Sequence, residues 1–162
     1  MGRNGYLIAS MLRNLQMNQL KLDTASQIID VALAKGRELA LAPLCVVVLD
    51  AGGHLIAAKR EDEASLLRPD IATGKAYGCL AMGFGGRELA RRAERSAPFF
   101  TALSGLTGGK VVPVPGGVLI RNREGFLLGS IGISGDTSVK DEECALAGIA
   151  SVELVADTGD AM

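Results

Sequence analysis

Apolar residues recur along the chain with two different periods, and the switches between these periods outline the predicted elements. Between Asp23 and Ala42 they return every three or four positions, which predicts a helix with one face against a sheet. The same reasoning predicts helices from Asp70 to about Gly83 and from Ser138 to about Ala156. A short polar helix is predicted over Arg87–Arg95, with one more helical turn after Ser96.

Short runs rich in Val, Ile and Leu, bounded by turn-forming residues, predict five strands. They are Leu44–Leu49, His54–Lys59, Lys110–Val114, Gly117–Asn122 and Phe126–Ser134. The element order is therefore α-β-β-α-α-β-β-β-α. Parallel strands would need a helical crossover between every pair, so we expect an α+β fold with a five-stranded antiparallel sheet and helices packed on it.

Composition and charge narrow the class of protein. With 162 residues, 48% of them hydrophobic, the chain can bury one core unaided, and we expect an N-terminal extension over residues 1–20 and a single domain over residues 21–158. A net charge of -1 argues against nucleic acid as a partner, and no run is long enough to span a bilayer. The three cysteines form no C-x-x-C pair, so we expect no metal site. The short, mixed apolar run near the N-terminus is unlike a secretory signal, which predicts a cytoplasmic protein.

Five segments, read in order, resemble the motifs of the GlcG/HbpS family of haem-binding or haem-degrading-domain proteins. They are VVVLDAGGHLIAAKREDEA, DIATGKAYGCLAMG, SAPFF, PGGVLI and GSIGISGDTSVKDEECALAGI. The resemblance implies a profilin-like sandwich, usually assembled as a homo-oligomer. It also implies relatives that bind haem and relatives fused to PduO-type corrinoid adenosyltransferases. One departure is Glu63, which stands where members commonly carry the glycine of an R-x-D-G-A motif.

Several residues inside these segments carry chemistry suited to a ligand site. Arg60 and Lys75 would bind a carboxylate, such as a small organic acid or a haem propionate, if both faced one cavity. The alternative is that Arg60 pairs with a neighbouring acid and Lys75 lies on a solvated helix face. The backbone of Pro115, Gly116 and Gly117 is bare enough for a ligand to approach. His54 is the only histidine and so the only imidazole that could ligate haem iron, but a polar residue after two glycines is also an ordinary turn residue.

Three functions are consistent with these features. The first is the binding of a small molecule, with haem or another tetrapyrrole as the ligand that the resemblance implies. The second is an isomerase or lyase of a catabolic pathway acting on a small carboxylate, in which Lys75 or Asp62 moves a proton and the N–H groups of Gly116 and Gly117 stabilise an enolate. The third is an assembly module with no ligand.

Overall fold

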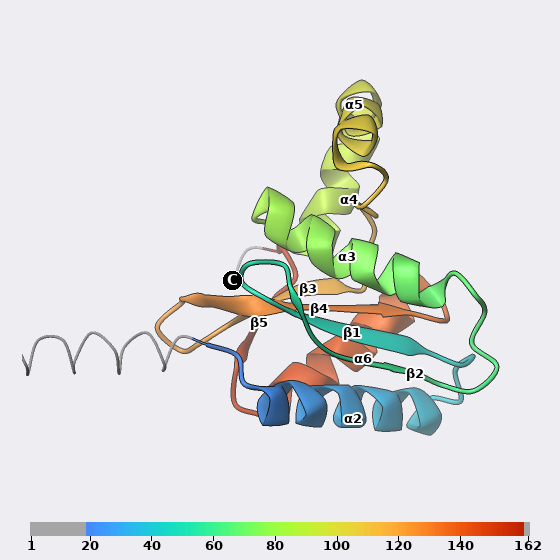
Figure 1. Ribbon diagram of the computed structural model, residues 1–162, viewed down its shortest axis with the longest axis vertical. Coiled ribbons are helices and arrows are strands. Elements are labelled where there is room, and N and C mark those ends of the chain that lie inside the picture. The colour runs from blue at the N-terminus through green and yellow to red at the C-terminus, as the bar shows by residue number, and fades with distance from the viewer. Residues whose placement is uncertain (1–18, 161–162) are drawn as a thin grey trace, which may run out of the picture.

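A five-stranded antiparallel sheet forms the centre of the molecule and carries helices on both faces, which confirms the predicted α+β fold (Figure 1). The computed structural model describes residues 19–160, so the predicted N-terminal extension lies almost entirely outside the described residues. The helices are α2 (Leu22–Glu38), α3 (Arg68–Met82), α4 (Gly86–Arg95), α5 (Ala97–Thr107) and α6 (Ser138–Ala150). The strands are β1 (Cys45–Asp50), β2 (Leu55–Arg60), β3 (Gly117–Arg121), β4 (Leu127–Ser134) and β5 (Val155–Asp157).

The sheet has the order β2-β1-β4-β3-β5, and one of its strands differs from the prediction. The strand predicted over Lys110–Val114 is instead an extended loop that runs along α3, where the Val112 N–H donates to the carbonyl oxygen of Gly74 at 3.1 Å. Prolines at 113 and 115 remove two donors that a sheet ladder would need. The fifth strand is β5, which the prediction had placed inside the last helix.

Helices α2 and α6 cover one face of the sheet, while α3 covers the other (Figure 1). The alternation along β1 decides which side chain faces which layer, because successive residues of a strand point to opposite faces. Val46 and Val48 join the α2–α6 core, whereas Cys45, Val47 and Leu49 pack under α3. Gly132 of β4 permits this arrangement, since a Cβ at that position would collide with the carbonyl oxygen of Ala72 in α3. Leu20, assigned to the extension by the sequence, is buried in the first core.

The helices α4 and α5 form an arm that rises from the α3 side of the body (Figure 1). Helix α4 is held at its start by Arg87, whose guanidinium bonds the buried carboxylate of Glu142 at 2.6 Å and also pairs with Asp160. No residue of α5 is buried, although the helix carries no charge. Among residues 19–160, no helix is both long and apolar enough to cross a membrane.

Candidate functional site

The structure distributes the predicted site residues over three places rather than one. Arg60 and Asp62 line a shallow cavity of about 400 Å³ at the end of β2, together with Arg37, Pro43 and Glu61. Arg37 is not available to a ligand there, because its guanidinium pairs with Glu61 at 2.8 Å. Arg60 and Asp62 therefore do come together, but Lys75 and the Pro115–Gly117 backbone lie elsewhere.

His54 lies at the opposite end of the β1–β2 hairpin from Arg60. The six-residue strand β2 separates them, which corresponds to about 20 Å. The imidazole is 82% exposed, and its Nδ1 lies 3.3 Å from Oδ1 of Asp50. Partial burial raises the pKa of Asp50, but N–H bonds from His54 and Gly52 outweigh it and leave this pKa below its ordinary value. The carboxylate is therefore charged near neutral pH and can orient the ring.

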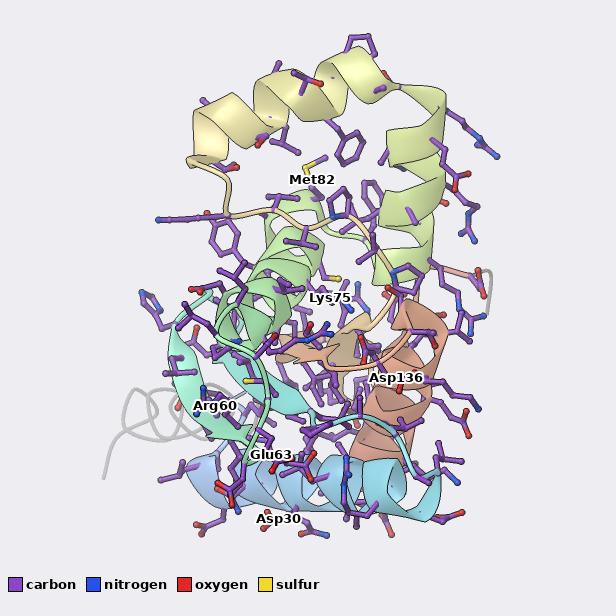
Figure 2. All side chains as sticks on the ribbon, turned by 90° about the vertical axis from the view of Figure 1, so that its right-hand side faces the viewer. Asp30, Arg60, Glu63, Lys75, Met82 and Asp136 are labelled. Carbon is purple, nitrogen blue, oxygen red and sulfur yellow. The ribbon has the colours of Figure 1, made fainter. Side chains whose placement is uncertain are left out.

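Lys75 is buried inside the molecule and already holds an internal anion. Its Nζ lies 2.7 Å from Oδ2 of Asp141, and the two side chains are 3% and 1% exposed. Burial raises the pKa of Asp141, and the Lys75 ammonium and the Asp136 N–H offset this only in part. In Figure 2, Lys75 lies between α3 and the start of α6, well apart from Arg60 near β2.

The glycines at the start of β3 pack against this ion pair. A Cβ at Gly116, whose φ is +99°, would lie 2.9 Å from Nζ of Lys75, and a Cβ at Gly117 would lie 2.5 Å from the Lys75 carbonyl oxygen. The Gly116 carbonyl accepts the Ile133 N–H at 2.9 Å. The structure thus brings Lys75 together with Gly116 and Gly117, as a closely packed contact. The catalytic roles suggested for Lys75 and Asp62 stay a prediction.

A groove that the sequence did not reveal runs along the outer face of α3. Its volume is about 500 Å³. Residues at positions 70, 73, 74 and 77 of α3 form its floor, the turn between β1 and β2 forms one wall, and the segment after α5 forms the other. The lining residues are Gly53, Asp70, Thr73, Gly74, Tyr77, Gly108, Gly109 and Lys110. Half of these are glycines, so backbone forms much of the wall.

Three polar side chains of the groove have no partner in the part of the chain that the structure describes. Asp70, Tyr77 and Lys110 make no side-chain hydrogen bond or ion pair with any residue in the range 19–160. Thr73 differs, because its hydroxyl donates to the Pro69 carbonyl at 2.8 Å. An anion, a phenol and a cation thus line one concave surface, which is typical of a small-molecule site. The 3.6-residue spacing of the floor could have shown that these α3 residues share a face, but only the fold brings Lys110 to them.

The chain is similar to known proteins in both sequence and structure. Residues 20–150 match the model of a family described as "Haem degrading protein HbpS-like". The corrinoid adenosyltransferase PduO of Citrobacter freundii is 30% identical over 135 residues, which are 83% of this chain and 39% of that protein. The chain spans 37% of the length of the Salmonella typhimurium PduO, also at 30% identity. It therefore corresponds to less than half of these curated relatives.

Several solved structures are similar over most of the chain. The PduOC–haem complex aligns with a TM-score of 0.76 at 28% identity, covering 85% of this chain and 97% of that one. A double mutant of HbpS from Streptomyces reticuli aligns with a TM-score of 0.71 at 25% identity, covering 82% of this chain and 86% of that one.

Proposed function

We propose that this chain, which belongs to the HbpS-like family, binds haem or a closely related tetrapyrrole in the groove along α3. The resemblance found in the five sequence motifs is confirmed by the family match. The observation that carries the proposal is the likeness to the PduOC–haem complex over 85% of the chain. The groove supports the location that we propose, because its volume falls in the range of sites for ligands of this size.

The residues of the groove suit a flat, largely apolar ligand with a charged edge. Tyr77 is half-buried and packs against the apolar cluster under α3, so it presents an aromatic surface at a fixed position. Lys110 is exposed and pairs with no acid among residues 19–160, and it supplies a positive charge for a carboxylate edge. Gly108 and Gly109 add no side chain that would fill the space.

Titration with hemin tests the proposal. We expect a saturable shift of the Soret band with one hemin per chain, and a linear response without saturation would contradict the proposal. Thr73→Trp should weaken binding, because an indole on the floor of the groove would occupy it. Thr101→Trp on α5 is the matched control, since Thr101 also is exposed and bonds the carbonyl four residues before it, Ala97, at 3.0 Å. Equal affinity of both variants would contradict the location.

We also propose that the chain self-associates through α5, as the homo-oligomer expectation requires. Leu106 on this helix is 85% exposed and Phe99 is 51% exposed. The segment from Ser96 to Gly109 has no charged residue, so two copies can meet there without like-charge repulsion. Light scattering after gel filtration should show an oligomer for the native chain and a smaller species for Leu106→Glu. A native monomer would contradict this second proposal and leave the first one standing.

A further inference from the structure

Tyr77 lines the groove with a ring that is packed in place and a hydroxyl that is free of the residues that the structure describes. Its ring packs against the cluster of Cys45, Val47 and Leu49 on the inner side. On the outer side, the ring lies 3.6–3.7 Å from where a Cβ of Gly53 would be. The hydroxyl makes no hydrogen bond within residues 19–160. A phenol held in this way needs little reorganisation to meet a ligand atom.

The other candidate ligands for iron are less well placed. The three cysteines are buried, and burial raises the pKa of the Cys79 thiol to about 12, which keeps it protonated. The Thr73 hydroxyl donates to the Pro69 carbonyl. His54 does not line the groove, and its ring stands almost fully in solvent beside Asp50. Tyrosine is an established type of axial ligand to haem iron, and a phenolate oxygen suits the ferric state.

We propose that Tyr77 ligates the iron of haem bound in the α3 groove and that Lys110 binds one of its propionates, an inference that rests on the proposed function. When the iron–oxygen bond forms, the phenol proton passes to solvent and the iron stays ferric, so no oxidant or reductant is required. The solvent ligand on that side of the iron leaves.

The two charged residues of the groove favour one direction of the porphyrin. Asp70 and Tyr77 are seven residues apart on α3, which places them about 10 Å apart along the helix. The carboxylate of Asp70 has no cation partner among residues 19–160, so it repels a propionate placed beside it. Lys110, on the wall formed by the segment after α5, attracts a propionate. The propionate edge therefore faces Lys110.

The test compares hemin with protoporphyrin IX, which has the same ring and propionates but no iron. Tyr77→Phe keeps the ring and its packing and removes only the hydroxyl oxygen. We expect this substitution to weaken hemin binding at least about tenfold and to leave protoporphyrin IX affinity unchanged. The phenolate-to-iron charge-transfer band and the phenolate modes in the resonance Raman spectrum of the hemin complex should disappear in the variant.

Lys110 is tested with hemin and its dimethyl ester. The native chain should bind hemin more tightly than the ester, and Lys110→Met should abolish that preference, because the variant has no cation for the propionate. A preference that persists in Lys110→Met would overturn this part of the proposal. Thermal melts of each variant establish that it is folded.

The outcomes separate this inference from the proposed function. If the native chain does not bind hemin, the proposed function itself fails. If the native chain binds hemin and Tyr77→Phe binds it equally well with an unchanged spectrum, the function stands and the ligand assignment is wrong. The assignment is also wrong if His54→Ala loses the iron–protein bands while Tyr77→Phe keeps them. Equal loss of hemin and protoporphyrin IX in Tyr77→Phe would show that the hydroxyl serves packing and not iron.

Discussion

Glu63 adopts a backbone conformation that suits glycine, and its replacement provides a sharp test of the fold. It lies in the loop between β2 and α3 with a φ of +66°. The Ala64 N–H donates to the carbonyl of Glu61 at 3.2 Å, which closes a β-turn in which Glu63 is the third residue. A positive φ at that position is characteristic of a type II turn, where glycine is preferred. The related family motif has glycine at this position. The structure therefore indicates that Glu63 holds a backbone conformation that is strained for a residue with a side chain.

The expected gain of Glu63→Gly can be worked out from two opposing terms. A left-handed conformation costs an L-residue about 1–2 kcal/mol. Replacing Glu63 with glycine removes that cost, but glycine is more flexible in the unfolded chain, which lowers the stability by about 0.5–1 kcal/mol. Glu63 is exposed and makes no ion pair within residues 19–160, so no contact is lost. The net gain should be about 0.5–1 kcal/mol, or about 1–4 °C in Tm for a chain of this length.

Urea unfolding followed by circular dichroism measures the change, with calorimetry as a second method. The midpoint should rise for Glu63→Gly while the slope of free energy against urea stays constant. Glu63→Ala removes the charge but keeps the Cβ, and it should leave the stability within a few tenths of a kcal/mol of the native value. A Glu63→Gly variant that is no more stable than the native chain would show that the left-handed backbone of Glu63 costs nothing. An equal gain in Glu63→Ala would show that the charge, and not the backbone, is the cause.

Four further predictions concern the body of the fold. Ala40, after the end of α2, has a φ of +53°, so Ala40→Gly should raise the urea midpoint by an amount corresponding to about 0.5–1 kcal/mol. Lys75→Met leaves the buried Asp141 carboxylate without its cation and should lower the free energy of unfolding by about 3–5 kcal/mol. The double variant that also carries Asp141→Leu should be less destabilised than Lys75→Met alone. Thiol reagents at pH 8 should label none of the three buried cysteines in the native chain and all three in denaturant. Burial raises the pKa of the Cys79 thiol from 9.0 to about 12. The stability that this protonated thiol contributes is therefore complete below pH 9 and should be lost as the pH rises to about 12. Unfolding curves of the native chain and of Cys79→Ala, measured over this alkaline range, test this prediction.

Those parts of the fold that depend on local pattern were predictable, and the part that depends on a distant partner was not. The β1–β2 hairpin follows from apolar runs on either side of a turn, and α3 follows from its helical period. The Val-rich run at 110–114 has the composition of a strand. Such a run joins a sheet only if the fold places it beside a strand with an unpaired edge, and the sequence does not show this. Here Val112 bonds to Gly74 of α3, and the edge of β3 pairs with Val155–Asp157 instead.

The site shows why buried and exposed charges lead to different conclusions about ligands. The apolar neighbours of Lys75 in sequence indicate that it faces inward, and the structure agrees. A buried cation requires an anion beside it, and Asp141 supplies that anion at 2.7 Å. Lys75 is therefore already paired inside the protein and is not available to bind the carboxylate of a ligand. Tyr77 is two residues later, about 200° around the same helix, and so faces the groove. There Lys110 and Asp70 stay solvated in the free protein at little cost. Charges that the fold leaves unpaired beside a cavity are therefore better evidence of a ligand than a charge that the fold has buried.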